Sequence, residues 1–152
     1  MSFMEAVRAC LRAYATFRGR ARRSEFWWFQ LYGLLLSIPA AIGFLVLYVA
    51  AFAGSVTGPA EDPAINPDAV NWGAFTAAMA VLAVYLFAFS VPALAVTSRR
   101  LHDAGQPAWW LAFHLIGFGI VVLALCLLEG QRGSNRHGAD PRLLPVRAGS
   151  RP

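Results

Sequence analysis

The chain has 152 residues, of which 58% are hydrophobic and 14% are charged, and its mean hydropathy is +0.52. A soluble core of this size could not bury so much apolar surface, so the composition excludes an ordinary soluble globular protein. The chain has 13 basic residues, all of them arginines, and 8 acidic residues, which gives a net charge of +5. No basic patch on a soluble recognition fold indicates that the protein binds nucleic acid.

Residues 3–17 predict an amphipathic helix ahead of the first long apolar run. Apolar side chains recur at helical spacing through this stretch, whereas Glu5, Arg8 and Arg12 fall on the opposite side. A cationic helix of this kind either lies in the headgroup plane with its apolar face toward the lipid or packs against the other helices. Both arrangements are compatible with the pattern.

Two charge-free apolar runs predict membrane-spanning helices over residues 26–53 and 72–97. Each run is longer than the roughly 18 apolar residues that mark a transmembrane candidate. The first run begins with an aromatic cluster typical of the membrane interface. As a helix it would be about 42 Å long, which exceeds a hydrocarbon core of about 30 Å, so we expect this helix to tilt or to kink at Pro39. Residues 54–71, rich in glycine, proline, asparagine and acid, predict a solvated loop.

The arginines orient these spans. Six precede the first span, none lies in the loop over residues 54–71, and two follow the second span directly. Because cytoplasmic flanks carry the excess of basic residues, we expect a cytoplasmic amino terminus and an external loop. Residues 98–107 are then expected to form a cytoplasmic loop.

Residues 108–128 form a third apolar run with two possible topologies. Unbroken, its roughly 20 residues span 30 Å, but the five arginines that follow would then lie on the outer side. Alternatively, Gly117 and Gly119 break the run into a re-entrant hairpin with arms of about 13 Å, which returns the tail to the cytoplasm. The arginine bias favours the second topology. Residues 1–142 then form one membrane domain, followed by a flexible tail over residues 143–152.

Polar residues next to the spans are candidates for binding. The first arginines arrive one turn before the aromatic cluster, a depth at which guanidinium groups meet lipid phosphates. Glu25 lies among them and is expected to form an ion pair with Arg22, Arg99 or Arg100. The candidate binding residues are Arg20, Arg22, Arg23, Glu25, Arg99, Arg100, His102, Asp103, Asn135, Arg136 and Asp140.

No catalytic residue, metal site or cofactor is predicted. His102 and Asp103 are adjacent, and adjacent side chains seldom converge on one atom, while a catalytic zinc usually needs three ligands. Capping of the neighbouring backbone is the ordinary role for such a pair. The glycine-rich segment over residues 130–141 lacks the context of a phosphate loop, so we expect it to fold as a cap against residues 99–103. His114 is an ionisable group inside the third run and a functional candidate by default.

Three blocks carry a family resemblance. Residues 17–27 read FRGRARRSEFW, residues 99–111 read RRLHDAGQPAWWL and residues 130–141 read GQRGSNRHGADP. They resemble the FxGRARRxEYW, RRLHDxGxSGWW and GxxGxNRYGPDP blocks of the bacterial inner-membrane family termed domain of unknown function 805, the YhaH-like proteins. The resemblance covers residues 3–142, with departures at positions 106–108, Ser134 and His137. It implies a small polytopic inner-membrane protein whose biochemical activity is not established.

The sequence therefore predicts an all-α polytopic membrane protein with an amphipathic amino-terminal helix and three hydrophobic helical segments, or four if the last is a hairpin. We expect a non-enzymatic scaffold or a lipid- or protein-interaction protein that uses its cytoplasmic arginine clusters. The expected partners are anionic headgroups of the bilayer and a second copy or another membrane protein. The alternatives are a transporter or channel subunit, and a membrane enzyme acting on a lipid phosphate through His102 with Asp103 or Asp140.

Overall fold

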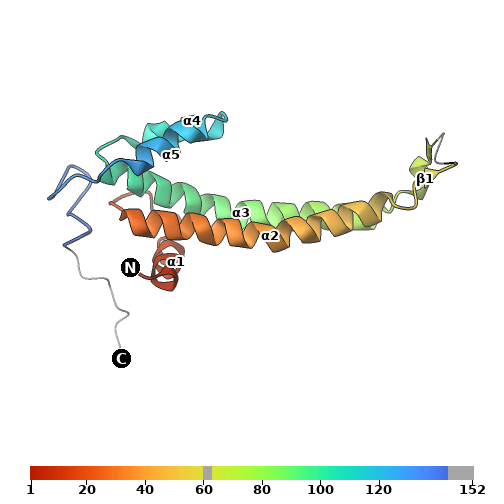
Figure 1. Ribbon diagram of the computed structural model, residues 1–152, viewed down its shortest axis with the longest axis horizontal. Coiled ribbons are helices and arrows are strands. Elements are labelled where there is room, and N and C mark those ends of the chain that lie inside the picture. The colour runs from red at the N-terminus through yellow and green to blue at the C-terminus, as the bar shows by residue number, and fades with distance from the viewer. Residues whose placement is uncertain (60–62, 144–152) are drawn as a thin grey trace, which may run out of the picture. The chain divides into compact units, whose positions relative to one another are not determined.

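The computed structural model describes residues 1–59 and 63–143, which form an α-helical chain with one short β-hairpin (Figure 1). The all-α fold predicted from the sequence is confirmed in its helices. The chain divides into two compact units, one made of residues 33–89 and the other of residues 1–32 with the chain from residue 90 onward. The elements are α1 Phe3–Arg12, α2 Arg23–Phe52, β1 Val56–Thr57, β2 Ala64–Ile65, η1 Pro67–Ala69, α3 Trp72–Asp103, η2 Ala108–Trp110, α4 Leu111–Leu115 and α5 Gly119–Leu127.

Within the described residues, α2 and α3 are the two helices long and apolar enough to cross a bilayer. With 30 and 32 residues, they measure about 45 and 48 Å at 1.5 Å per residue, more than a hydrocarbon core of about 30 Å. Pro39 and Pro92 lie inside the two helices. Most of this extra length is apolar, because the charged side chains of the two helices are confined to residues 23–25 and 99–103.

The carboxyl end of α3 corrects a prediction. The helix runs to Asp103, so residues 98–103 are helical instead of belonging to a loop over residues 98–107. The reason is that Arg100 and Asp103 of this last turn pair with each other and Asp103 also pairs with Arg20 from another segment, so these charged side chains need no exposure to water. The turn that follows is tight, with the amide of Gln106 donating to the carbonyl of Leu101 at 2.8 Å.

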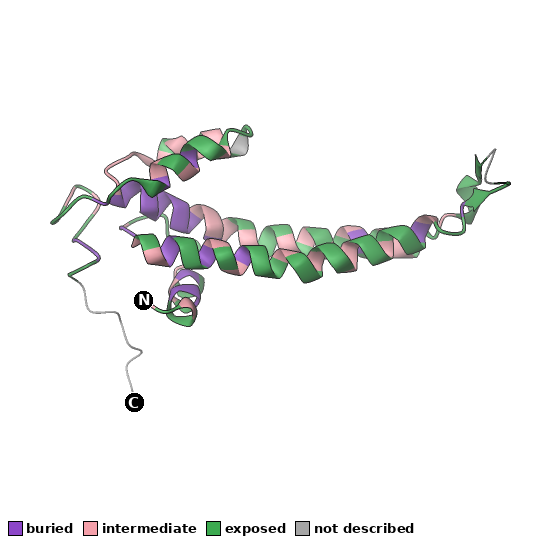
Figure 2. Ribbon diagram, viewed as in Figure 1, coloured by how far each residue is buried: buried purple, intermediate pink, exposed green. Residues whose placement is uncertain are grey.

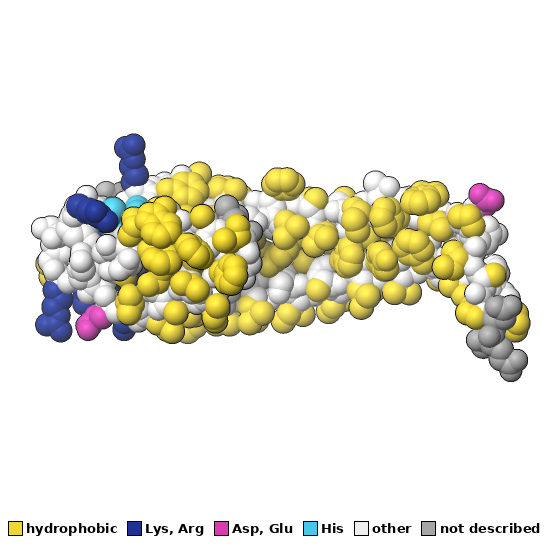
Figure 3. Space-filling model, turned by 90° about the horizontal axis from the view of Figure 1, so that it is seen from above, with side chains coloured by type: hydrophobic (Ala, Val, Ile, Leu, Met, Phe, Trp, Pro, Cys, Tyr) yellow, Lys and Arg dark blue, Asp and Glu magenta, His cyan; other side chains and the backbone are white. Residues whose placement is uncertain are grey.

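In the unit of residues 33–89, α2 and α3 lie side by side (Figure 1). Most of their side chains are exposed or half-buried, among them Ile42, Val46 and Phe87, which are 59%, 61% and 77% exposed (Figure 2). Hydrophobic side chains cover the visible face of this unit in the space-filling view (Figure 3). An apolar surface of this extent suits contact with lipid tails.

The predicted loop over residues 54–71 contains a small β-hairpin. β1 and β2 pair antiparallel, with Val56 opposite Ile65 and Thr57 opposite Ala64. Each strand is only two residues long, which is too short to show the alternation of apolar and polar residues by which a sequence indicates a strand. Asn71 closes the loop, because its amide donates to the carbonyl of Ala51 at 2.9 Å.

The helix α1 begins with a capping box. The Ser2 hydroxyl accepts from the amide of Glu5 at 3.4 Å, and the Glu5 carboxylate accepts from the amide of Ser2 at 2.8 Å. The backbone and hydroxyl donors of Ser2 lower the pKa of Glu5 from its ordinary value. α1 ends at Arg12, so the predicted helix over residues 3–17 is too long. The helix ends early because the chain beyond it turns toward α3, where the carbonyl of Phe17 accepts a hydrogen bond from the Ser98 hydroxyl at 3.1 Å.

Of the two arrangements expected for α1, the structure adopts packing against another helix. Ala6, Val7 and Cys10 are buried. The ring of Phe3 meets the ring of Trp28 edge-on at 5.8 Å between centroids. The apolar face of α1 is thus covered by α2, while Arg8 and Arg12 stay exposed.

The last apolar run folds as a helical hairpin. Gly117 has φ +90°, a left-handed conformation that glycine adopts without steric cost, and it separates α4 from α5. The amide of Phe118 reaches back to the carbonyl of Phe113 at 2.8 Å and tightens the turn. The hydrophobic helical segments are therefore α2, α3, α4 and α5, the hairpin alternative of the predicted fold.

Candidate functional site

Three segments that are far apart in the sequence meet at one polar cluster, which we call the cap: residues 18–25, 98–106 and 129–143. Backbone hydrogen bonds join them, from the amide of Ala21 to the carbonyl of Arg99 at 3.0 Å and from the amide of Gln131 to the carbonyl of Asp103 at 2.8 Å. In the space-filling view, the visible arginine side chains lie over the unit that contains the cap (Figure 3). The prediction that the glycine-rich segment packs against residues 99–103 is confirmed.

Asp103 is the centre of the cap. Its Oδ1 accepts from Nε of Arg20 at 2.9 Å, and its Oδ2 accepts from Nη1 of Arg100. The side chains of Arg20 and Arg100 are 1% and 0% exposed, and that of Asp103 is 5% exposed. A Cβ at Gly130 would lie 2.0 Å from Oδ2, so only glycine lets the third segment approach this carboxylate. One buried carboxylate therefore holds two arginines from different segments.

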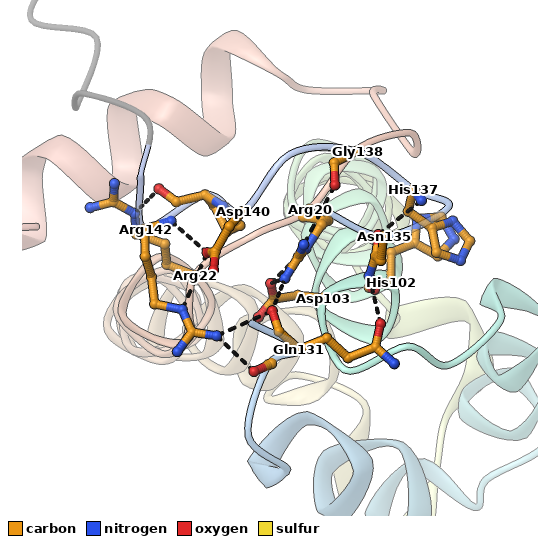
Figure 4. Close-up of polar contacts among 12 residues, drawn as sticks. Arg20, Arg22, His102, Asp103, Gln131, Asn135, His137, Gly138, Asp140 and Arg142 are labelled. Carbon is orange, nitrogen blue, oxygen red and sulfur yellow. Dashed lines mark hydrogen bonds and ion pairs between the residues drawn. The ribbon is translucent and has the colours of Figure 1, made fainter. Parts of the chain in front are cut away.

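Arg20 ties the first segment to the third. Besides Asp103, its guanidinium donates to the carbonyls of Gln131, of Gly133 at 2.5 Å and of Gly138 at 3.5 Å. Figure 4 shows the side chain reaching between Asp103 and the loop at Gly138. Because a planar guanidinium offers five N–H donors, a single arginine can fix several turns of an irregular loop.

Two further arginines cap the carboxyl end of α5. Nε of Arg100 donates to the carbonyl of Cys126 at 3.0 Å, and its Nη2 donates to that of Leu128. Arg23 donates to the carbonyls of Leu127 and, at 3.1 Å, of Leu128. The last carbonyls of a helix lack partners within it and carry partial negative charge, so cations there stabilise it. The hairpin is therefore anchored to the cap by charge-assisted hydrogen bonds.

A separate buried ion pair joins Glu25 to Arg99, one of the pairs expected from the sequence. Nη1 of Arg99 donates to Oε1 of Glu25 at 2.8 Å, while Nε and Nη2 of Arg99 are buried without a partner among the described residues. The Cys10 thiol lies 3.7 Å from the same carboxylate oxygen. Burial, followed by the charge of Glu25, raises the pKa of Cys10 to about 12, so this thiol is not an activated nucleophile.

The third segment is folded by its own polar groups. Asp140 accepts from the amide of Arg142 at 2.9 Å and from that of Gly133 at 3.1 Å. The Arg142 amide contributes most to lowering the pKa of this carboxyl from its ordinary value. Asn135 donates to the carbonyl of His102 at 3.0 Å and thereby joins the loop to α3.

Two imidazoles stack across the cap. The rings of His102 and His137 are 3.9 Å apart between centroids and within 7° of parallel (Figure 4). Nδ1 of His102 lies 3.2 Å from the carbonyl of Gly19, and Nε2 of His137 lies 2.9 Å from Nε of Arg136. Because arginine only donates, His137 accepts this bond in its neutral form. Burial, followed by the charges of His102, Arg136 and Arg20, lowers the pKa of His137.

This stack predicts that acid destabilises the protein. A lowered pKa means that the unfolded chain binds the proton more tightly, so the stability from neutral His137 is present above its ordinary value of 6.5 and is lost as the pH falls below it. We expect Tm in detergent to fall between pH 7.5 and 5.5, and to fall less in His137→Phe, which keeps a stacking ring without a titratable group. Equal pH slopes for the two proteins would contradict the prediction.

A pocket of about 330 Å³ opens at the junction of the first and third segments. It is lined by both charged and small residues, and the three arginines among them come from residues 22–23 and 142. The lining residues are Arg22, Arg23, Ser24, Asp103, Glu129, Gly130, Pro141 and Arg142. Six of these eight residues have polar or charged side chains.

The structure gathers the predicted binding residues but uses them in two ways. Arg20, Arg99 and Arg100 are buried and turned toward partners within the chain, and so are Glu25, His102, Asp103 and Asp140. Arg136 is exposed, Asn135 is half-buried inside the loop, and Arg22 and Arg23 line the pocket. Sequence reasoning missed Arg142, Gln131 and His137 as parts of the cluster. The signal for Arg142 was its place two residues after Asp140, whose carboxylate it contacts at 3.3 Å.

Within residues 1–59 and 63–143, no group of three or more histidine, cysteine, aspartate or glutamate side chains is placed to hold a metal ion. His114 lies on α4 near the turn of the hairpin, where a Cβ at Gly119 would be 3.0 Å from its Nδ1. Among the described residues, its side chain forms no hydrogen bond or ion pair with a candidate binding residue.

Comparison with known proteins gives consistent matches. A family model described as "Protein of unknown function (DUF805)" matches residues 14–139. Inner membrane protein YhaI of Escherichia coli strain K12 is 33% identical over 141 residues, covering 91% of this chain and 97% of the relative. Inner membrane protein YhaH of the same strain is 29% identical over 137 residues, covering 89% and 94%. No solved structure shows a significant match.

Proposed function

This chain belongs to the DUF805 family, whose relatives are inner-membrane proteins, and on that premise we propose a non-enzymatic scaffold whose cytoplasmic cap binds anionic lipid headgroups. The observation that carries the proposal is that some arginines are buried in contacts within the chain whereas others are exposed. Arg20, Arg99 and Arg100 are buried in internal contacts and hold the cap together. A second set of arginines remains exposed on its surface.

The contacts of the cap support a topology with two crossings. Arg20 donates to carbonyls of residues 131–138, and Nε of Arg22 donates to the carbonyl of Pro141 at 2.7 Å, so the segments before α2 and after α5 lie on one side of the membrane. α4 and α5, with 5 and 9 residues, measure about 8 and 14 Å, and neither reaches across a core of about 30 Å. The hairpin then re-enters its own leaflet, and the arginine excess makes that side cytoplasmic.

The exposed arginines are positioned for headgroups. Trp27 and Trp28 are 39% and 38% exposed at the start of α2, and tryptophans of this kind lie at the membrane–water interface. Five exposed arginines that do not line the pocket belong to α1 and to the segments next to this level: Arg8, Arg12, Arg18, Arg132 and Arg136. Near an anionic surface each contributes about 1 kcal/mol of binding free energy.

The geometry lends less support to the alternatives. A membrane enzyme would need His102 and an aspartate free to act, but His102 is stacked and bonded to Gly19, and Asp103 is shared by two buried arginines. A transporter would need a polar path through the spans. The pocket of about 450 Å³ between α2 and α3, around Pro39 and Tyr85, has an almost wholly apolar lining.

The proposal is tested by titrating the full chain, in neutral detergent at low salt, with phosphatidylglycerol or phosphatidylcholine while following Tm. We expect phosphatidylglycerol to raise Tm more than phosphatidylcholine, and 0.5 M salt to remove the difference, because salt screens exposed charges. Glutamine at Arg8, Arg12, Arg18 and Arg132 together should remove most of the difference without lowering Tm in phosphatidylcholine. Equal effects of the two lipids on the natural chain would contradict headgroup binding.

A further inference from the structure

The arginines that line the pocket at the start of α2 differ from the five exposed arginines outside it because hydrogen bonds to the backbone hold them in place. Nε of Arg22 is bonded to the carbonyl of Pro141 at 2.7 Å, Arg23 to the carbonyl of Leu128 at 3.1 Å, and Arg142 to the carbonyl of Gly130 at 2.7 Å. Each guanidinium therefore has a fixed orientation before any ligand arrives. A fixed set of donors loses little conformational entropy on binding.

Two of these arginines, Arg23 and Arg142, keep N–H donors for a ligand. A guanidinium has five N–H groups. Among the described residues, Arg23 contacts carbonyls through Nε and Nη2, and Arg142 makes its contacts through its amide, Nε and Nη2, which leaves Nη1 of both without a protein acceptor. The two side chains approach the pocket from different segments, as donors around a tetrahedral oxyanion must.

The charge balance of the pocket is positive. Of its two lining carboxylates, Asp103 is already shared by Arg20 and Arg100, and Glu129 is 69% exposed and lies 4.0 Å from Arg132. Asp103 is thus neutralised by arginines that do not line the pocket, which leaves three lining arginines against the exposed Glu129. The amino terminus of α2 adds its partial positive charge, since the first N–H groups of a helix lack intrahelical partners.

From this geometry we propose that the pocket lined by Arg22, Arg23, Ser24 and Arg142 is a specific site for a phosphate monoester. Nη1 of Arg23 and Nη1 of Arg142 can each donate charge-assisted hydrogen bonds to phosphate oxygens, and a volume of about 330 Å³ accommodates a phosphate with a small polar substituent. The site goes beyond the proposed surface binding because it is one discrete pocket. Its phosphate comes either from a lipid headgroup, at the level of the nearby tryptophans, or from a soluble phosphate ester.

The test is calorimetric titration of the full chain, in neutral detergent, with glycerol 3-phosphate, and in a second arm with nanodiscs containing phosphatidic acid. We expect saturable binding in at least one arm, weakened at least tenfold by Arg142→Gln. The control is Arg132→Gln, because Arg132 is 87% exposed and does not line the pocket. It should leave the affinity for glycerol 3-phosphate unchanged and weaken nanodisc binding far less than Arg142→Gln does, since it removes one surface charge and no donor of the pocket. Binding in the nanodisc arm alone identifies a lipid phosphate, and equal binding of glycerol 3-phosphate identifies a soluble ester.

A second variant protects the test against misfolding. Ser24→Asp places a carboxylate in the first turn of α2, where acidic residues stabilise a helix, so the protein should keep its Tm while losing phosphate binding at least tenfold. Absence of binding in both arms by the folded natural chain would overturn the site, as would equal weakening by Arg132→Gln. Neither result would contradict the proposed binding of lipid headgroups at the surface, because that proposal is tested with phosphatidylglycerol and with the four arginines outside the pocket.

Discussion

We expect Asp103→Asn to lower the free energy of unfolding by about 3–5 kcal/mol, the cost typical of removing one partner from a buried ion pair. The substitution keeps the size of the side chain but leaves Arg20 and Arg100 facing a neutral amide, with side chains only 1% and 0% exposed. Water cannot replace the lost partner at such burial. The measurement is chemical or thermal unfolding of both proteins in the same detergent.

The control for this prediction is Glu129→Gln. This change also removes a carboxylate that lines the pocket, but Glu129 is 69% exposed and its ion pair with Arg132 is 4.0 Å long. Exposed pairs of this kind contribute about 0–1 kcal/mol, so stability should change by less than about 1 kcal/mol. A loss in Asp103→Asn no larger than that in Glu129→Gln would mean that the buried carboxylate does not hold the cap together.

The second large effect concerns the side of the membrane on which the glycine-rich segment lies. A cysteine at Ser134, in a chain whose Cys10 and Cys126 are serine, should be protected from an impermeant maleimide in intact cells and labelled once the inner membrane is permeabilised. The reason is that Arg20 and Arg22 bond to carbonyls on both sides of this position in the sequence, so the segment shares their side of the membrane, which we propose is cytoplasmic. Labelling is read by the mass shift of the purified protein.

A matched cysteine at Ile65 serves as the external control. Ile65 is 74% exposed in β2, within the loop whose lack of arginine predicts an external location. It should be labelled in intact cells with an otherwise identical protocol. If the cysteine at position 134 is labelled as fast as the one at position 65, the two segments share a side, and the re-entrant hairpin and the cytoplasmic cap are both wrong.

The sequence determined the membrane class of this protein, its two long helices and the family to which it belongs. Hydropathy is a local property, so a charge-free run such as residues 72–97 is sufficient to predict a spanning helix. Because hydropathy is local, it also predicted the end of the second long helix wrongly. The change to arginine at position 99 indicated the start of a loop, although α3 continues to Asp103. Partners far along the chain neutralise that last turn, and no local pattern reveals them.

Which arginines are buried in the fold and which line the pocket or lie at the surface follows from contacts in three dimensions. Glu25 had three possible partners in the sequence, and Arg99 is the one that lies 2.8 Å from it. Arg20 looked like its neighbour Arg22, yet it is buried against Asp103 while Arg22 lines a pocket. Whether a guanidinium faces inward or outward depends on acceptors contributed by segments about 80 to 120 residues away, because a buried charge is stable only where its partners converge.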